Sequence, residues 1–523
     1  MPYLTLAATD SLTPFLLCAG VVAAVMLLWD TIEVGRNDAA NLINAVFGAR
    51  VLTRRAAVMV AAAGVILGAC ASEGVIETAR KGIFDPKMLT LEQAISVYIA
   101  VYIVDTIMLY AYSAYGMPVS TTATLVFSLL GASLSMRIGG IVDWGVAGKI
   151  IGAIFLSIFI TGVVAFFVQR AVRGAVRDRA QNLSVALVHG GWIGGGMLAA
   201  LCYFMLVKGM RHTEFVSDLN EKLKSSEIGT VIIVIALWTA FAIAIHALLV
   251  LFGKKAARNL FPVLAVIGTF AMAFSFGQND LANAASPGLA IYNLIDHRAE
   301  GVVAATDQPL PMLALLGCGV FMALGMTTTN AQRVTSAAVH AGSMAHTVRL
   351  WAPRWCHKVA RFFLRFRGRQ PVLAPLPTTT AEGKTKHYDV LRACVILAVS
   401  ACVIATASGF KLPVSTTYVA FAAVIATGMA DRILQRGDAE LKTARTVWVV
   451  FSWLSAAVLA AVGAALVCQM VYLLSWPGMF IAIAVNLALR HVVKKRSDAH
   501  ETRVRQEARE RAHPELYVEE TEG

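Results

Sequence analysis

The chain has 523 residues, of which 58% are hydrophobic and only 15% are charged, and its mean hydropathy is +0.67. Soluble globular proteins carry about 25% charged residues, so this composition excludes that class and indicates a polytopic membrane protein. The formal net charge of +13 does not predict a nucleic-acid partner. Its basic residues cluster in loops beside apolar runs, which is typical of membrane topology.

Apolar runs that are long enough, or nearly long enough, to cross a membrane recur along the whole chain. They lie at 14–29, 56–72, 93–113, 146–169, 183–207, 229–252, 259–276, 310–329, 390–408, 446–474 and 477–490. A crossing needs about 20 residues, so the short runs are expected to be completed by flanking segments at 119–136, 281–295 and 412–430. We predict an all-α polytopic membrane protein with about ten to twelve passes and with broken or re-entrant helices.

Two polar segments interrupt these runs in the same way. Gly35–Asn41 and Gly277–Asn283 both read G-x-N-D-x-A-N, and their aspartates are 242 positions apart (280 − 38). A carboxylate and two amides inside an apolar segment cost several kcal/mol in lipid unless they face partners or a cavity. The repetition of so costly an arrangement predicts one duplicated functional site.

A second motif is also duplicated. Pro118–Thr122 and Pro413–Thr417 both read P-V-S-T-T, 295 positions apart (413 − 118). Each follows its G-x-N-D-x-A-N motif, so the order of motifs is the same in both halves. Internal repeats in a membrane protein are typical of secondary transporters, whose site lies at the repeat interface near the midplane of the membrane.

The motif order predicts the organisation of the chain. The first transporter repeat spans 12–180 and the second 255–490, with connecting helices at 181–254 and a charged tail at 491–523. Within the second repeat, the insertion 343–387 carries nine Lys or Arg residues against one acidic residue. Because basic loops beside spans stay on the cytoplasmic side, we expect this insertion to be cytoplasmic and the protein to lie in the plasma (inner) membrane.

The P-V-S-T-T motifs predict an anion site. Proline favours the first turn of a new helix, and a helix that begins inside the membrane offers free N–H donors and a positive dipole end. Two such ends facing each other would bind a tetrahedral oxyanion with neutral donors. For one copy alone, a Pro-kinked helix with self-bonded hydroxyls is the competing interpretation. The candidate substrate-binding residues here are Ser120, Thr121, Thr122, Ser415, Thr416 and Thr417.

The N-D-x-A-N motifs predict a cation site. Their Asp and second Asn are three residues apart and share a helical face. The oxygens suit Na⁺ or a proton, and a cation there would remove the repulsion between the carboxylate and an anionic substrate. A buried structural polar pair is the alternative. The candidate cation-binding residues are Asn37, Asp38, Asn41, Asn279, Asp280 and Asn283.

These duplicated motifs, together with Glu77–Ile83 (E-T-A-R-K-G-I), resemble the PiT inorganic phosphate transporter family, whose signatures read GANDVAN, PVSTT and ETIRKGI. The resemblance covers both halves of the chain. It implies an inverted-repeat transporter that carries inorganic phosphate with Na⁺ or H⁺. It also implies that the Asp, Asn, Ser and Thr residues of the motifs form the phosphate and ion sites.

Some positions leave two interpretations open. Arg36 stands where the family has a small residue, and Gln278 holds the same position in the second motif. Both are candidate substrate ligands. Alternatively, Arg36 would form a helical ion pair with Glu33, three residues earlier. Glu77 is a candidate proton relay or an ion-pair partner of its basic neighbours. Asp105, alone in its apolar run, is structural or ion-coupling.

The sequence therefore predicts symport of inorganic phosphate with Na⁺ or H⁺. A permease for another tetrahedral oxyanion, such as sulfate, and an uncoupled anion channel are the alternatives. No nucleophile with a base or metal is recognisable in the sequence, so we do not predict an enzyme, a cofactor, or a metal other than transported Na⁺. The expected partners are phosphate, the coupling cation and membrane lipid, and a homodimer is a possible assembly.

Overall fold

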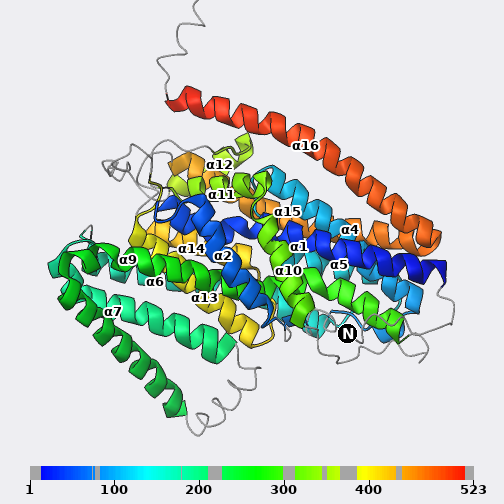
Figure 1. Cartoon of the computed structure of the whole chain (residues 1–523). Coiled ribbons are helices and arrows are strands. Elements are labelled where there is room, and N and C mark those ends of the chain that lie inside the picture. The colour runs from blue at the N-terminus through cyan, green and yellow to red at the C-terminus, as the bar shows by residue number, and fades with distance from the viewer. Residues whose placement is uncertain are drawn as a thin grey trace, which may run out of the picture.

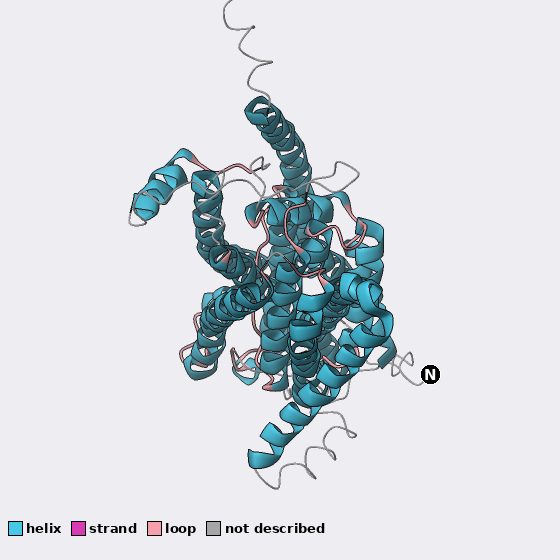
Figure 2. Cartoon of the chain, turned by 90° about the vertical axis from the view of Figure 1, so that its left-hand side faces the viewer, coloured by secondary structure: helices cyan, strands magenta, loops and turns pink. Residues whose placement is uncertain are grey.

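A computed structural model describes residues 13–72, 75–76, 83–177, 179–209, 227–297, 312–343, 350–365, 386–431 and 439–512. These residues are almost entirely helical and contain no strand (Figure 2), which confirms the predicted all-α class. The elements, in chain order, are α1 (Pro14–Gly48), α2 (Arg54–Ala69), η1 (Pro86–Met88), α4 (Leu91–Ala114), α5 (Thr121–Ser135), α6 (Trp144–Val176), α7 (Leu183–Cys202), η2 (Tyr203–Gly209), α9 (Glu227–Asp296), α10 (Met312–Gly325), α11 (Thr329–Ala341), α12 (Arg354–Arg365), α13 (Val390–Gly409), α14 (Thr416–Ala430), α15 (Ala439–Leu474) and α16 (Trp476–Ala512).

Eight of the described helices are long and apolar enough to cross a membrane, or nine if the pair α10 and α11, bent by 69°, forms one span. This number of spans treats α9 as a single helix. Each of its arms, 227–252 and 254–296, is itself long enough to cross at about 1.5 Å per residue. The predicted range of about ten to twelve passes stays a prediction that these helices accommodate.

Helix α9 changes direction at Gly253. This residue has φ 54° and ψ −128°, a conformation that glycine adopts without the steric cost of a Cβ atom. The first arm pairs with α7 at one side of the bundle, and the second arm runs into its body (Figure 1). The turn therefore delivers the second G-x-N-D-x-A-N motif to the centre of the protein.

The chain leaves the helical conformation before each P-V-S-T-T motif. After α4 and after α13 it is non-helical, and the short helices α5 and α14 begin at Thr121 and Thr416. Ser120 and Ser415 are their N-caps, accepting the N–H of Ala123 at 3.0 Å and of Tyr418 at 3.1 Å. The prediction of two helices beginning inside the apolar body is confirmed, and the Pro-kinked alternative is wrong.

The position of the prolines differs from the prediction. Pro118 and Pro413 lie in the non-helical segments, two residues before the N-caps, instead of in the first helical turn. Since proline holds its own φ and disfavours helix in the residue before it, each proline keeps its segment extended. The serine then starts the helix.

The glycine that opens each G-x-N-D-x-A-N motif lies at a close helix crossing. A Cβ atom on Gly35 would be 1.8 Å from Met322 O on α10, and one on Gly277 would be 2.3 Å from Val65 O on α2. The partner helices contribute glycines of their own to these crossings, namely Gly325 and Gly68. Each motif helix is thus packed against a helix from the other half of the chain.

Candidate functional site

The first Asn of each motif holds the extended segment of its own half. Asn37 Nδ2 donates to Val119 O at 2.6 Å, and Asn37 Oδ1 accepts the Val119 N–H at 3.2 Å. Asn279 makes the same two bonds to Val414, at 2.7 and 3.2 Å. An amide can donate and accept at once, whereas a carboxylate only accepts. This requirement explains why asparagine precedes the aspartate in both motifs.

The aspartates are bound by hydroxyls from the opposite half. Thr417 on α14 donates to Asp38 Oδ1 on α1 at 2.6 Å. Thr121 on α5 donates to Asp280 Oδ1 on α9, also at 2.6 Å. All four side chains are at most 1% exposed. The structure therefore brings the two motif types together across the interface of the halves, instead of grouping them half by half.

The second Asn of each motif lies beside its aspartate, as their spacing of three residues requires. Asn41 Nδ2 donates to Asp38 Oδ1 at 2.5 Å and lies 3.1 Å from the Thr417 hydroxyl. Asn283 Nδ2 donates to Asp280 Oδ1 at 2.9 Å. One oxygen of each carboxylate is therefore surrounded by donors.

The second oxygen of each motif aspartate is not surrounded by donors. Asp38 Oδ2, Asp280 Oδ2 and the amide oxygen of Asn283 are buried, and none has a hydrogen-bond partner among the described residues. Leaving a buried acceptor unsatisfied costs about 1–3 kcal/mol, and more for a charged group. Three acceptor-only oxygens without donors suit a bound cation or a proton.

The remaining hydroxyls of the motifs have different environments. Thr122 donates to Val414 O at 2.9 Å, and Thr417 approaches Val119 O at 3.2 Å, so each extended segment is also held from the other half. Thr416, buried in the first turn of α14, lies close to Asp280, and its hydroxyl has no partner within hydrogen-bonding geometry among the described residues. The capping oxygens of Ser120 and Ser415 accept a backbone N–H, which leaves each hydroxyl hydrogen as a donor.

Arg36 makes the ion pair that its spacing from Glu33 allows. Its Nη1 lies 2.6 and 2.8 Å from the two oxygens of Glu33, and its Nε donates to Thr328 Oγ1 at 3.2 Å. Asp38 follows two residues later, on nearly the opposite side of the helix. The guanidinium therefore faces away from the duplicated site, and its role as a substrate ligand stays a prediction.

The two remaining candidate residues are Gln278 and Glu77. Gln278 Nε2 donates to Ala71 O at 3.3 Å, which places this side chain against the end of α2. Glu77, the candidate proton relay, lies outside the described residues together with Thr78–Gly82.

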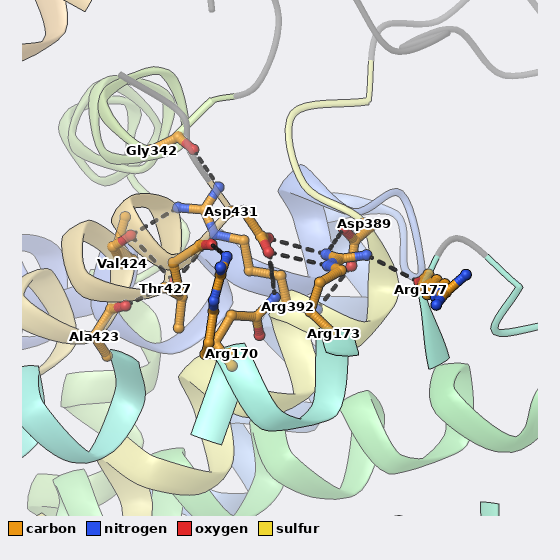
Figure 3. Close-up of polar contacts among 12 residues, drawn as sticks. Arg170, Arg173, Arg177, Gly342, Asp389, Arg392, Ala423, Val424, Thr427 and Asp431 are labelled. Carbon is orange, nitrogen blue, oxygen red and sulfur yellow. Dashed lines mark hydrogen bonds and ion pairs between the residues drawn. The ribbon is translucent and has the colours of Figure 1, made fainter. Parts of the chain in front are cut away.

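A cluster of ionic contacts at one end of α6 is not predictable from the local sequence. Arg173 donates to Asp431 from two nitrogens at 2.9 Å, and also bonds to Asp389, the N-cap of α13 (Figure 3). Gln169, one turn earlier, donates to both oxygens of Asp431 at 3.0 and 2.9 Å. From the sequence alone, the basic residues at 170–179 indicate only membrane topology, because the acidic partners of Arg173 are more than 200 positions away.

Arg392 completes this end of the bundle. Its side chain is fully buried and donates to Gly342 O and Val424 O, each at 2.7 Å, and to the Thr427 hydroxyl at 3.0 Å (Figure 3). Together with Arg173, it ties α6, α11, α13 and α14 to one another. These contacts join four helices at one end of the bundle but do not touch the duplicated motifs.

The model of the phosphate transporter family (PHO4) matches residues 34–339 and 377–499. The chain belongs to the phosphate transporter family. Transport of inorganic phosphate across the membrane, the function predicted from the sequence, is thereby confirmed, and the protein is a transporter and an integral membrane protein.

Individual relatives of this phosphate transporter family member are distant. A protein of Thermococcus kodakarensis named "Putative phosphate permease" is 25% identical over 80% of this chain and 89% of its own length. A protein of the same description from Pyrococcus abyssi is 29% identical over 60% of this chain and 75% of its own length. A solved structure described as "The sodium-dependent phosphate transporter" covers 87% of this chain and 99% of its own, with a TM-score of 0.64 and 21% identity. The fold is thus that of a known phosphate transporter.

Proposed function

We propose that the protein is a symporter that couples phosphate entry to a cation, with both ligands bound where the duplicated motifs cross. The observation that carries the proposal is the pair of aspartates, each held by a hydroxyl of the opposite half through one oxygen and left with the other oxygen unsatisfied among the described residues. A Na⁺ ion or a proton at these oxygens would neutralise the two carboxylates. Without it, they would repel an oxyanion.

The phosphate ligands in this proposal are the N-terminal ends of α5 and α14. Both ends offer main-chain N–H groups and buried hydroxyls, and both lie beside an aspartate. Such an end attracts an anion through its donors and through the helix dipole. Because these donors are neutral, the anion is not held by a full positive charge and can leave again.

Crossing of the motifs gives a physical basis for coupling. The hydroxyl that orients Asp38 belongs to α14, and the hydroxyl that orients Asp280 belongs to α5. A cation at an aspartate therefore changes the position of a group at the phosphate-binding helix end. Neither ligand can bind without affecting the groups that hold the other.

Reconstitution in liposomes tests the proposal. Phosphate uptake is measured with an imposed Na⁺ gradient, with an imposed pH gradient, and with neither, and sulfate and arsenate are added as competitors. Symport requires that one gradient drives accumulation. Uptake that ignores both gradients would indicate an anion channel, and inhibition by sulfate at the potency of phosphate would indicate a general oxyanion permease.

The location and orientation are part of the proposal. The basic segment 343–387 supports a plasma (inner) membrane protein with this segment in the cytoplasm. Within this segment, the short helix α12 (Arg354–Arg365) carries several basic side chains and two exposed phenylalanines, Phe362 and Phe363. This combination is suited to binding a membrane surface of anionic lipid. Cysteine labelling from either side of the membrane at Arg361 would establish the orientation.

Assembly as a homodimer is also a proposal, to be tested by the mass of the purified protein.

A further inference from the structure

A second group of carboxylates is buried outside the duplicated motifs. Asp30 and Glu33 lie on α1 and Asp105 lies on α4, and their exposed fractions are 1%, 0% and 1%. Helix α16 packs against both α1 and α4 and contributes Arg490 to the same region. Three acidic side chains are thus enclosed in an apolar bundle, where an unpaired charge is expensive.

Only one of the three is neutralised by arginine. Glu33 lies 2.6 Å from Arg36 Nη1 and 2.7 Å from Arg490 Nη1. The other nitrogens of Arg490 donate to Asn486 Oδ1 at 2.8 Å and to Thr106 O at 2.6 Å. Arg490 is therefore directed at Glu33 and at two neutral acceptors.

Asp30 and Asp105 have no such donors. All four of their carboxylate oxygens are buried, and none has a hydrogen-bond partner in the part of the chain that the structure describes. The two carboxylates also repel each other, and both are repelled by Glu33, whereas Arg490 attracts Asp30 without a hydrogen bond to it. With all three acids ionised, the two arginines leave the cluster with one uncompensated negative charge.

Helix α5 contributes two buried hydroxyls on one face. Thr124 lies close to Asp105, and its hydroxyl donates to Thr121 O at 2.9 Å. Ser128 follows one turn later on the same face of α5. Ser128 is fully buried, and its hydroxyl has no hydrogen-bond partner among the described residues. On the side of α9, the hydroxyl of Tyr102, near Asp30, is already bonded to Ala284 O and to the Gly288 N–H.

This acidic cluster is not duplicated. The spacings of the repeats place Met272 opposite Asp30 (30 + 242), Ser275 opposite Glu33 (33 + 242) and Ser400 opposite Asp105 (105 + 295). None of these second-half residues is acidic. The cluster is therefore a separate feature of the first half, added to the symmetric site.

We propose that Asp30 and Asp105 bind one monovalent cation, Na⁺ or a proton, at a site separate from Asp38 and Asp280. The four unpartnered carboxylate oxygens are ligands of the kind that a hard cation takes, and one positive charge balances the cluster. Asp30 lies two helical turns before Asn37 on the same face of α1, at about 10 Å. A cation there is close enough to act electrostatically on the duplicated site at low dielectric.

The proposal rests on cation coupling for its role in transport, but the binding itself is tested without phosphate. The background is the double variant Asp38→Asn/Asp280→Asn, which removes the charges of the duplicated site. In this background, ²²Na⁺ binding and the rise in melting temperature caused by Na⁺ are measured on purified protein. We expect one remaining Na⁺ site, which Asp30→Asn/Asp105→Asn abolishes and the matched second-half change Ser400→Ala leaves intact.

If the ligand is a proton, the background variant binds no ²²Na⁺. Wild-type protein in liposomes then carries one more proton per phosphate, by reversal potential, than Asp30→Asn/Asp105→Asn does. The single variants Asp30→Asn and Asp105→Asn serve if the double variant does not fold. Unchanged ²²Na⁺ binding together with an unchanged cation-to-phosphate ratio would overturn the proposal. Uptake that is uncoupled from any gradient would refute the symport mechanism alone, because the binding measurement does not depend on transport.

Discussion

The hydroxyl of Thr417 donates to Asp38 across 2.6 Å, although the two residues are 379 positions apart. The corresponding bond from Thr121 to Asp280 runs in the opposite direction between the halves. Each half therefore contains the acid of one hydrogen-bonded pair and the donor of the other.

Removing the charge of either aspartate should stop coupled transport with little effect on folding. In Asp38→Asn and Asp280→Asn, the amide oxygen still accepts the threonine hydroxyl, but the negative charge that attracts a cation is absent. We expect phosphate uptake to fall at least about 30-fold, since losing an interaction with a charged group costs about 2–3 kcal/mol. Radiolabelled phosphate uptake measures the loss, and a near-normal rate in one variant alone would show that the two pairs are not equivalent.

Removing the donor tests the exchange directly. Thr417→Val keeps the shape of the side chain but leaves Asp38 without its hydroxyl partner, which costs about 1.5–3 kcal/mol. We expect about a 10- to 100-fold loss in apparent cation affinity, and rescue by Thr417→Ser. Thr269→Val is the matched control, because that buried hydroxyl bonds only to its own helix, at Ala265 O.

The motif glycines should not tolerate a methyl group. In Gly35→Ala or Gly277→Ala the new Cβ meets backbone atoms of α10 or α2, which cannot move aside like a side chain. We expect a loss of about 1–3 kcal/mol in stability, as for overpacked cores. Melting in detergent measures it against Gly152→Ala, a helical glycine with nothing within 4 Å of the added atom, which should be neutral or slightly stabilising. Equal melting temperatures would contradict the close crossing.

Arg36 provides a test of a residue that faces away from the site. In Arg36→Ala, Glu33 keeps its ion pair with Arg490 at 2.7 Å, so the buried carboxylate is not left alone. We expect the KM for phosphate to change less than about twofold, which is within about 0.5 kcal/mol. A large increase in KM would mean that the guanidinium reaches the substrate during transport.

The contacts of Arg173 should stabilise the end of the bundle at which they lie. Arg173→Gln leaves Asp431 and Asp389 without their common cation, and breaking a largely buried ion pair costs about 3–5 kcal/mol. We expect a lower melting temperature and partial recovery in Arg173→Gln/Asp431→Asn. If the double variant is no more stable than the single one, the carboxylates do not depend on this arginine.

The features that could be predicted from the sequence are those in which local chemistry is repeated. Two copies of G-x-N-D-x-A-N and of P-V-S-T-T were enough to predict a duplicated site and helices that begin inside the membrane, because proline and serine act on their own neighbours. The spacing of three residues also predicted that Asp38 and Asn41 lie together.

The exchange of partners between the halves was not predictable in this way. The sequence analysis assigned cation oxygens to one motif and anion donors to the other, whereas Thr417 binds directly to an aspartate. Spacing along a helix also left Arg36 ambiguous, since a guanidinium three residues from Glu33 can turn toward it or away. Pairs such as Arg173 and Asp431 join helices far apart in the chain, and only packing decides which of several acids an arginine meets.

The close crossings at the motif glycines join the two parts of the chain twice. Gly35 on α1 packs against α10, and Gly277 on α9 packs against α2, so each motif helix meets the helix that follows the other motif. Such reciprocal contacts are the pattern of an isologous two-fold interface. A displacement of either motif helix therefore meets backbone atoms of the other part of the chain, and not only side chains that can turn aside.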